Sequence, residues 1–466
     1  MLRANEYRTH TCGQLRESDI GKQVRLSGWL ENVRDHGGVK FVDLRDQYGI
    51  VQVVVEDEEM LEGIPRESAI RVTGLVAERD EDTINKKLDT GYIEIEADSI
   101  DVLGKVREFL PFDVTTSKET KEDLRLKYRF LDLRNVEVQK NIILRSQVIS
   151  FIRSKMTDIG FLEIQTPILT SSSPEGARDY IIPSRKHPGK FYALPQAPQV
   201  FKQLLMVSGF DKYFQIAPCF RDEDARADRS PGEFYQLDFE MSFATQEDVF
   251  SAAEEVLYQT FTKFSNREVS KPPFKRIPYE EAMLVYGSDK PDLRNPLKII
   301  DISPMFEKTD FAPFRKKTVR AINVPDCSSQ PKRFFEDMLG FATKIGMKGL
   351  GYIKVDDEMK YQGPIDKFLS QEDRKELAHK ANLNPGDVLF FIADTKDHAP
   401  KLAGQIRTEL AKRLDLIDES RFEMCFIVDF PMYEIDEETG ATAFTHNPFS
   451  MPQGGLKSLI EKDPLD

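Results

Sequence analysis

Cysteine is scarce in this sequence, and the few cysteines lie far apart. They are Cys12, Cys219, Cys327 and Cys425, and no Cys-x-x-Cys pair occurs in 466 residues. Zinc sites and disulfide frameworks need cysteines at short or matched spacings, so neither is expected. Reduced thiols are typical of the cytoplasm, and we predict a cytoplasmic protein.

Long apolar runs and a positive charge balance are also lacking. No stretch approaches the roughly 20 apolar residues that a membrane helix needs. The polar start MLRANEYRTH has no signal-peptide core, and we predict no membrane partner. The formal net charge of −14 disfavours nucleic-acid binding through bulk charge, so such binding would need a local basic surface.

The chain does contain enough apolar material for several cores. Hydrophobic residues make up 40% and charged residues 31% of the sequence, which is ordinary for a globular protein. A length of 466 residues exceeds what one hydrophobic core usually supports. We therefore expect two to four domains.

The first hundred residues show the alternation of β-strands. In VRLSGWL (24–30) every second residue falls on one apolar face, and Gln47-Tyr48-Gly49 marks a turn between two later strands. Several short strands with polar turns suggest a small barrel. An oligonucleotide-binding (OB) barrel is one possibility.

After a polar linker the periodicity changes to that of helices and longer strands. We predict a helix over 138–156 that ends before Gly160, and then a strand that ends near Pro167. Further predicted elements are a helix closed by Gly209, strands over 213–220 and 233–243, and a helix over 245–264 capped by Thr245 with Asp248.

From about Leu297 the sequence changes character again. Helical and strand patterns alternate up to about residue 420, as expected of an inserted module. The segment 421–450 then returns to long strand patterns, with a hairpin predicted at Thr439-Gly440.

One charged stretch, FRDEDARADRSPGEFYQLDFE (220–240), joins two of the predicted strands. Arginine binds phosphate in bidentate fashion, and a neighbouring carboxylate can accept a hydrogen bond from an exocyclic amine. Phe234 offers a flat surface on which a base can stack. The stretch is therefore either a nucleotide clamp or a solvated hairpin loop, and by itself it favours the loop.

Other polar residues also allow two interpretations. Gln199 and Lys202 share one face of a predicted helix, which suits a small acidic ligand, although taken alone the pair favours a solvent-facing stripe. SSSPEGARDY (171–180) has the composition of a mobile loop. His446 follows a strand, where a lone histidine is more often structural than functional.

Taken together, several segments resemble the class II aminoacyl-tRNA synthetases of the bacterial aspartyl type. In chain order they are CGQLRESDIGKQVRLSGWLENVRDHGGVKFVDLRD, LKYRFLDLRN, GFLEIQTPILTSSSPEGARDY, FYALPQAPQVFKQLLM, FRDEDARADRSPGEFYQLDFEMSF, YGSDKPDLRNP and THNPF. No single segment is specific, but their occurrence in this order is.

The resemblance implies an α+β protein of five parts. These are an OB-fold β-barrel that binds the anticodon (1–107), a hinge (108–138), a class II catalytic domain with a mixed, mostly antiparallel sheet (139–300), an inserted α/β domain (301–423), and an incomplete return to the catalytic domain (424–466). The segment around Pro167 would build a homodimer interface.

The resemblance also implies the reaction, which is ATP-dependent attachment of L-aspartate to tRNA(Asp) through an aspartyl-adenylate, with Mg²⁺. Arg221 and Lys202 would be catalytic. The ATP-binding residues would be Arg221, Asp222, Glu223, Phe234 and Gln236. The aspartate-binding residues would be Glu175, Gln199, Lys202, Arg221, Asp238 and His446. No metal ligand is expected within this chain.

For the barrel, the resemblance implies anticodon binding by Arg34, His36, Phe41 and Gln52. Aromatic stacking with hydrogen bonds to base edges is how proteins recognise single-stranded RNA. Whether tRNA(Asn) is accepted besides tRNA(Asp) stays open at this point.

The chain departs from the family pattern in small and large ways. Asn447 replaces a frequent second histidine, Ala197 replaces a frequent serine, and RSPGEF is one residue longer than some forms of the loop. The family's third motif, with its ATP-binding arginine, is not present before the end at Asp466. We therefore expect a truncated synthetase with little or no aminoacylation activity. The alternatives are a non-catalytic RNA-binding paralogue, or a sibling ligase for asparagine or lysine or an amide-forming synthetase.

Overall fold

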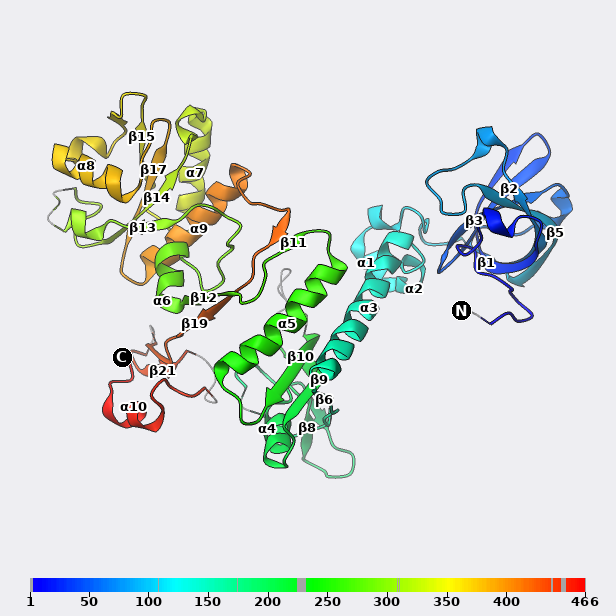
Figure 1. Ribbon diagram of the computed structural model, residues 1–466, viewed down its shortest axis with the longest axis horizontal. Coiled ribbons are helices and arrows are strands. Elements are labelled where there is room, and N and C mark those ends of the chain that lie inside the picture. The colour runs from blue at the N-terminus through cyan, green and yellow to red at the C-terminus, as the bar shows by residue number, and fades with distance from the viewer. Residues whose placement is uncertain are drawn as a thin grey trace. The chain divides into compact units, whose positions relative to one another are not determined.

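The computed structural model describes residues 3–107, 109–173, 175–223, 232–307, 309, 311–436, 439–445 and 450–465 (Figure 1). The chain divides into two compact units, Met1–Gln147 and Val148–Asp466. Each unit is described by itself. Among the described residues, no helix combines the length and the apolar character needed to cross a membrane.

The first unit contains a closed five-stranded barrel. Its strands are β1 (Gln23–His36), β2 (Val39–Asp46), β3 (Gly49–Val55), β4 (Ala69–Glu78) and β5 (Ile93–Gly104), in the order β1-β2-β3-β5-β4. Strand β3 pairs with β5 in parallel, and the other pairings are antiparallel. This arrangement confirms the predicted OB fold, and the predicted turn at Gln47-Tyr48-Gly49 joins β2 to β3.

Alternation along β1 creates the core of the barrel. Val24, Leu26 and Leu30 are fully buried inside it. Gly28 lies on the same strand where β1 crosses close to β2, and a Cβ atom there would lie 2.4 Å from the Arg45 carbonyl oxygen. Glycine is therefore required at this crossing, because any side chain would push the two strands apart.

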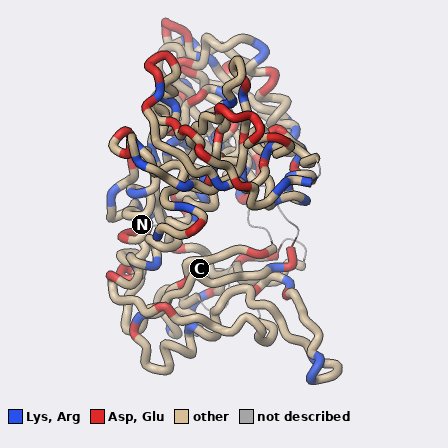
Figure 2. The backbone as a smooth tube through the Cα atoms, turned by 90° about the vertical axis from the view of Figure 1, so that its right-hand side faces the viewer, with Lys and Arg blue, Asp and Glu red and all other residues tan. Residues whose placement is uncertain are grey.

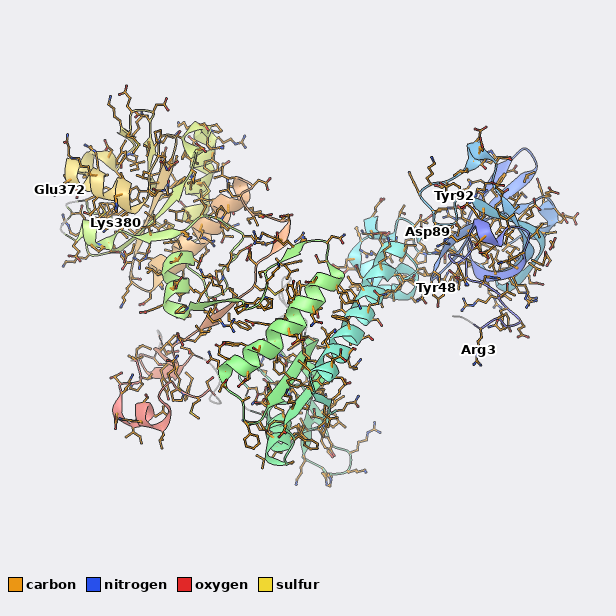
Figure 3. All side chains as sticks on the ribbon, viewed as in Figure 1. Arg3, Tyr48, Asp89, Tyr92, Glu372 and Lys380 are labelled. Carbon is orange, nitrogen blue, oxygen red and sulfur yellow. The ribbon has the colours of Figure 1, made fainter. Side chains whose placement is uncertain are left out.

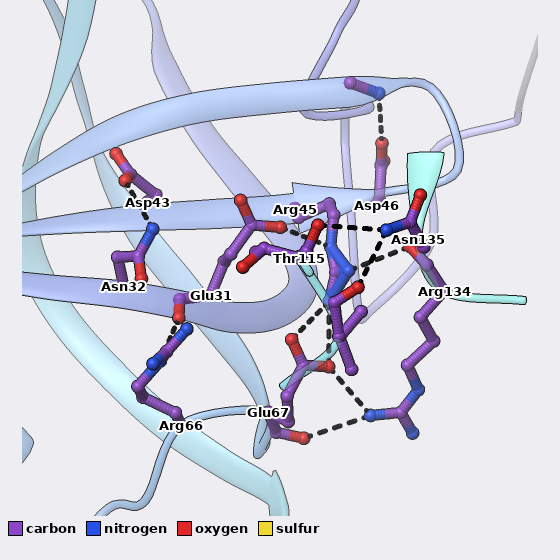
Figure 4. Close-up of polar contacts among 12 residues, drawn as sticks. Glu31, Asn32, Asp43, Arg45, Asp46, Arg66, Glu67, Thr115, Arg134 and Asn135 are labelled. Atoms are coloured by element: carbon purple, nitrogen blue, oxygen red, sulfur yellow. Dashed lines mark hydrogen bonds and ion pairs between the residues drawn. The ribbon is translucent and has the colours of Figure 1, made fainter. Parts of the chain in front are cut away.

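A buried group of four charged residues joins the barrel to the segment before α3, and we call it the hinge network (Figure 4). It consists of Glu31, Arg45, Glu67 and Arg134. Arg45 pairs with Glu31 at 2.8 Å and with Glu67 at 2.6 Å, and Arg134 pairs with Glu67 at 3.0 Å. The Arg45 guanidinium also donates to the Arg134 carbonyl oxygen at 3.0 Å. The two cations and two carboxylates thus link the barrel to a segment that is distant in sequence.

Short helices α1 (Glu122–Lys127) and α2 (Arg129–Asp132) precede the long helix α3 (Val136–Asp158). Asn135 caps α3, because its Oδ1 accepts the backbone N–H of Glu137 at 3.0 Å. The helix ends before Gly160, as predicted, where φ is +88°. Burial along the helix is uneven: Met156 is buried, but Ile142 is 48% exposed, because the described core of this region covers only the C-terminal half of the helix.

The second unit begins with a small sheet covered by helices. Strands β9 (Lys212–Phe220) and β10 (Glu233–Met241) are antiparallel, and β6 (Leu162–Glu163) pairs with β9 in parallel. Helices α4 (Gln199–Val207) and α5 (Gln246–Phe264) and the hairpin β7 (Ile181–Pro183) and β8 (Phe191–Ala193) complete this part. The predicted capping of α5 by Thr245 and Asp248 is confirmed.

The predicted strand ending near Pro167 is much shorter than expected. Only two residues of β6 pair with β9, and one further backbone bond runs from the Ile164 N–H to the Phe214 carbonyl oxygen. The chain therefore leaves the sheet before Pro167, which has no N–H to donate and could not extend the ladder.

The inserted region forms its own five-stranded sheet. Its strands are β13 (Ile299–Asp301), β14 (Thr318–Val324), β15 (Gly351–Val355), β16 (Tyr361–Gln362) and β17 (Val388–Asp394), in the order β13-β14-β17-β15-β16 with antiparallel pairings. Strand β17 alternates between two cores: Phe390 packs with α7 (Lys332–Lys344) and α9 (His398–Arg413), and Phe391 with α8 (Gln371–Lys380). The helix–strand alternation expected from the sequence is confirmed.

Helix α8 illustrates how local sequence sets an element's ends. Ser370 and Asp373 form a reciprocal capping box at its start. Glu372 lies in the first turn and Lys380 in the last (Figure 3). Both charges oppose the helix dipole and stabilise the ends.

The last part of the chain forms short strands. β18 (Arg421–Phe422) pairs with β11 (Glu268–Val269), and β19 (Cys425–Val428) pairs with β12 (Lys275–Pro278). β20 (Tyr433–Ile435) and β21 (Thr442–Phe444) form the predicted hairpin, which confirms that turn, and α10 (Gly455–Glu461) follows. The expectation of long strands here is wrong, because Asp429 has a φ of +57° and Pro431 interrupts the extended backbone.

Candidate active site

The two strands β9 and β10 give one apolar face and one polar face. Directly opposite residues of an antiparallel pair share a face. Phe214, Leu237 and Phe239 lie in the core with α3 and α5. The other face therefore carries the paired sets Cys219–Phe234, Ala217–Gln236, Gln215–Asp238 and Tyr213–Glu240.

Lys202 lies at the centre of this polar face. Its ammonium contacts Asp238 at 3.0 Å and Glu240 at 3.3 Å, and its side chain is only 14% exposed. Burial opposes the charge on Lys202, but Asp238 and Glu240 outweigh burial and raise the pKa of the ammonium. Lys202 is therefore a fixed cation held between two carboxylates.

Helix α4 presents Lys202 inward and part of its apolar surface outward. Val200 and Leu204 are 46% and 54% exposed, while Lys202 points to β10. The helix ends before Gly209, whose φ is +92°. Gln199 is the first residue of α4 and is half-buried. A polar side chain that points inward is what we expect if Gln199 and Lys202 bind a small acidic ligand.

The loop before β7 brings Glu175 to the same cluster. Ser173 donates to Glu175 at 3.1 Å, and Gln196 anchors the loop by exchanging two hydrogen bonds with the Ala177 backbone at 2.9 and 3.0 Å. Burial raises the pKa of Glu175, while Ser173, Arg221 and Lys202 lower it in part. The Asp222 N–H also donates to the Arg178 carbonyl oxygen at 2.9 Å, so the loop that carries Glu175 lies beside the segment that carries Arg221.

Arg221 extends the polar face beyond the end of β9. Its guanidinium lies 5.0 Å from the centre of the Phe234 ring, and its backbone N–H donates to the Gly232 carbonyl oxygen at 2.8 Å. The neighbouring Asp222 and Glu223 are exposed. Arg178 braces this segment, because its Nε donates to the Asp222 carbonyl oxygen at 2.9 Å.

A buried thiol lies between these charges. Cys219 donates to Gln236 Oε1 at 3.1 Å. Burial raises the pKa of Cys219 to about 11, with smaller effects of Arg221, Asp238, Glu175 and Lys202. The thiol is therefore neutral at physiological pH and does not act as a nucleophile.

The structure thus gathers most of the residues singled out for ATP and aspartate. Arg221, Lys202, Asp238 and Glu175 share one cluster, with Phe234 and Gln236 on the same face. His446 lies outside the described residues. Sequence reasoning missed Glu240 and Gln196. Glu240 could have been found from its position two residues after Asp238 on the same strand face.

The cluster is amphoteric and suits a zwitterionic ligand. Lys202 and Arg221 can bind carboxylate or phosphate, while Glu175, Asp238 and Glu240 can bind an ammonium group. Among the described residues, no three or more His, Cys, Asp or Glu side chains are placed so that they could hold a metal ion together. A Mg²⁺ ion here would take most of its oxygen ligands from a bound triphosphate and water.

A second polar surface lies on the outer face of the barrel. Arg34 binds both oxygens of Asp43 at 2.9 Å and also donates to Gln52 at 3.1 Å. Gln52 in turn donates to Glu94 at 2.8 Å. His36 meets the edge of the half-exposed Phe41 ring at 5.7 Å. The four residues named for the anticodon therefore lie together on the neighbouring strands β1, β2 and β3.

Comparison with known proteins identifies the same two parts. A family model described as tRNA synthetases class II (D, K and N) matches residues 121–463, and one described as an OB-fold nucleic acid binding domain matches residues 24–103. An aspartate–tRNA(Asp/Asn) ligase of Rickettsia bellii is 56% identical over 98% of this chain and 77% of its own length. An aspartate–tRNA ligase of Streptomyces coelicolor is 55% identical over 99% of this chain and 79% of its own length.

The solved structures support the fold. An asparaginyl-tRNA synthetase from Pyrococcus horikoshii, complexed with asparaginyl-adenylate, has a TM-score of 0.52 at 20% identity. The match covers 86% of this chain and 95% of that one.

Proposed function

Because the chain belongs to the class II tRNA synthetases of the D, K and N group, we propose that its function is the ATP-dependent attachment of L-aspartate to tRNA. The observation that carries this proposal is the Lys202 cluster, in which the Lys202 ammonium lies between Asp238 and Glu240 of β10. Arg221 follows the end of β9, and Glu175 lies in the loop that is hydrogen-bonded to the Arg221 segment. Aspartate brings one ammonium and two carboxylates. Each of its charges finds an opposite charge in this cluster.

The reaction takes place in two steps and needs no protein nucleophile. An oxygen of the aspartate α-carboxylate bonds to the α-phosphorus of ATP, and the bond to the β-phosphate breaks to release pyrophosphate. A terminal ribose hydroxyl of the tRNA then attacks the activated carbonyl, and AMP leaves. The protein's part is positioning and charge stabilisation.

We assign roles from the position of each side chain. Arg221 neutralises charge at the α-phosphate, and Phe234 stacks on the adenine, with Asp222, Glu223 and Gln236 along the nucleotide. Glu175 and Asp238 hold the ammonium of aspartate with Gln199 nearby, and Lys202 binds its side-chain carboxylate. Mg²⁺ would neutralise the triphosphate. His446 is proposed for aspartate binding from the sequence pattern alone.

The specificity for aspartate follows from the charge of Lys202. An asparagine side chain is neutral, so it would add no counter-charge to the buried ammonium of Lys202. It would also displace water that hydrogen-bonds to the ammonium without replacing it by an anionic partner. The Glu240 carboxylate holds Lys202 in place at 3.3 Å. A lysine substrate would place a second cation against Lys202 and would be repelled.

Binding of adenylate analogues tests the proposal. Aspartyl-sulfamoyl-adenosine should bind at least roughly 100-fold more tightly than the asparaginyl analogue, the size expected when a buried charge loses its partner. Calorimetric titration of the 466-residue chain measures both, and it does not depend on the rate of turnover. Equal affinity for the two analogues would contradict the proposal.

The barrel is proposed to recognise the anticodon. The name of the Rickettsia relative includes both tRNA(Asp) and tRNA(Asn), whereas the Streptomyces relative is named only as an aspartate–tRNA ligase. We propose binding of tRNA(Asp), with tRNA(Asn) as a second acceptor. Competition of the two transcripts for the chain measures the preference, and a Kd ratio above about 100 would exclude tRNA(Asn) at cellular concentrations.

The domain boundaries at residues 107, 138, 300 and 423 are proposed on the same basis. A homodimer and a cytoplasmic location also stay predictions. Within the second unit, the exposed Leu162 of β6 favours an interface near that strand. Sedimentation of the purified chain at several concentrations measures the assembly.

A further inference from the structure

The β7–β8 hairpin carries a group of cations that the proposed chemistry does not use. Its tip, Ser184–Lys190, contains Arg185, Lys186 and Lys190, and all three are exposed. Among the described residues, no carboxylate forms an ion pair with any of these three. In Figure 2 a hairpin with a blue tip projects at the lower right.

The charge of this segment is unusual for the chain. The sequence contains 79 aspartates and glutamates, yet positions 180–210 contain none. The nearest carboxylates along the sequence are Asp179 and Asp211. The hairpin therefore forms the local basic surface that a protein of net charge −14 needs in order to bind a polyanion.

The tip is a defined turn. Ser184 accepts the His187 N–H on its hydroxyl at 3.2 Å, and the Ser184 N–H donates to the Lys190 carbonyl oxygen at 2.9 Å. Gly189 has a φ of +76°, which allows the chain to reverse direction. Backbone bonds thus close the turn on itself, and the cationic side chains remain free to point outward.

The base of the hairpin joins the rim of the candidate active site. The Leu194 N–H donates to the Tyr180 carbonyl oxygen at 2.9 Å, and the Phe220 N–H donates to the Pro195 carbonyl oxygen at 2.9 Å. The Tyr180 hydroxyl packs so close to Gly232 that a Cβ atom there would lie 2.5 Å from it. Gly232 accepts the backbone N–H of Arg221, so the hairpin is anchored to the segment that carries Arg221.

From these observations we propose that the tip of the β7–β8 hairpin binds the phosphate backbone of the tRNA next to its acylated end. The inference rests on the proposed function, since it assigns a second contact for the same tRNA. Arg185, Lys186 and Lys190 neutralise phosphates without reading bases, and they guide the strand toward the Lys202 cluster.

A salt series with the full chain and a tRNA(Asp) transcript tests the proposal. Each phosphate contact contributes roughly 0.9 to the slope of log K against log salt, so the double variant R185Q/K186Q should lower the slope by about 1.8. The loss of affinity between about 50 and 200 mM salt should then shrink roughly tenfold. Lys190→Gln should lower the slope by about 0.9.

Helix α7 offers a matched control. Lys332 and Arg333 are 90% and 88% exposed, and changing both to Gln alters net charge by the same amount. Each has a carboxylate one helical turn away, Glu336 at 3.3 Å and Asp337 at 3.8 Å, which neutralises its field. K332Q/R333Q should leave the salt slope within about 0.3 of the wild-type value.

The outcomes separate this inference from the proposed function. A wild-type chain that binds no tRNA would overturn both. Wild-type binding with an unchanged slope in R185Q/K186Q would overturn the hairpin contact alone, and so would an equal effect of K332Q/R333Q. An isolated anticodon stem-loop should bind the hairpin variants as tightly as wild type. Weaker binding of the stem-loop to the hairpin variants, or a changed oligomeric state of these variants, would also count against the proposed hairpin contact.

Discussion

The hinge network of the first unit and the Lys202 cluster of the second are both built from buried opposite charges, but only one of them is balanced. The hinge network pairs two arginines with two glutamates, and the Arg45 and Glu67 side chains are 3% and 4% exposed. The Lys202 cluster has two cations against Glu175, Asp238 and Glu240, and Glu240 is 34% exposed. A closed and balanced group holds the fold together. An open group with excess carboxylate can accept the ammonium of a ligand.

The backbone of Glu67 shows how closely the hinge network is built. Its backbone has a φ of +64°, which is unusual for a residue with a side chain. Its N–H donates to the Leu30 carbonyl oxygen at 2.7 Å, and its carboxylate binds both arginines. The unfavourable backbone is tolerated because the carboxylate must reach both guanidinium groups.

The largest effect is expected where the balanced group is broken. Glu67→Gln should lower the free energy of unfolding by about 3 to 5 kcal/mol, because the buried Arg45 and the partly exposed Arg134 lose their shared carboxylate. Urea unfolding followed by circular dichroism measures the change. As a control, Arg71→Gln removes a more exposed pair with Asp101 and should cost less than about 1 kcal/mol. Similar losses in the two variants would show that the hinge network has no special role.

The open cluster should respond in ligand binding rather than in stability. Lys202→Leu should weaken binding of aspartyl-sulfamoyl-adenosine by roughly 100-fold, because the substrate carboxylate loses its cation. ATP affinity should change by less than about threefold, since Arg221 and Phe234 remain. Calorimetry with the two ligands gives both values. Equal losses for both ligands would contradict the role given to Lys202.

The barrel surface provides an intermediate case, in which a charged network supports an exposed aromatic ring. Phe41→Ala should weaken binding of an anticodon stem-loop by roughly 10-fold, the size expected for one lost base stack. Tyr48→Ala is the matched control, because Tyr48 is 52% exposed in the β2–β3 turn of the same barrel. Fluorescence anisotropy with labelled RNA measures both. A larger effect of Tyr48→Ala would move the RNA site to that turn.

The smallest effect concerns the protonation of Glu175. Its pKa is raised above 4.5, chiefly by burial. A raised carboxyl pKa stabilises the folded state below the unfolded pKa, and this contribution is lost as the pH rises through the folded value. The stability of wild type relative to Glu175→Gln should therefore fall as the pH increases from about 4. Urea unfolding at several pH values tests this, and a relative stability that rises with pH would contradict it.

Strand alternation made much of the fold and part of the site predictable. The buried Val24 and Leu26 of β1 follow from period two, and the capping of α5 by Thr245 follows from the sequence around it. Residues of β9 and β10 could be assigned to one face because their spacing fixes it. Glu240 belongs to the same series, so its face was predictable, but its contact with Lys202 depends on where α4 packs and was not.

Other features depend on partners that are distant in sequence. Whether α3 buries its apolar face, how long β6 runs, and which arginine Glu67 binds were not available from local pattern. Arg45 and Arg134 lie on opposite sides of the polar linker. Only folding shows that the same carboxylate holds both.

The sequence by itself determined the order of elements, the barrel, the inserted module and the family. Local periodicity and the order of motifs can be recognised without knowing which residues are in contact. Tertiary structure alone decided which charges are balanced and which remain open to a ligand. The physical reason is that the free energy of a buried charge depends on what lies within a few ångströms of it, and those neighbours come from other elements. In this protein the neighbours of each buried charge distinguish the hinge network, which stabilises the fold, from the Lys202 cluster, which is proposed to bind aspartate.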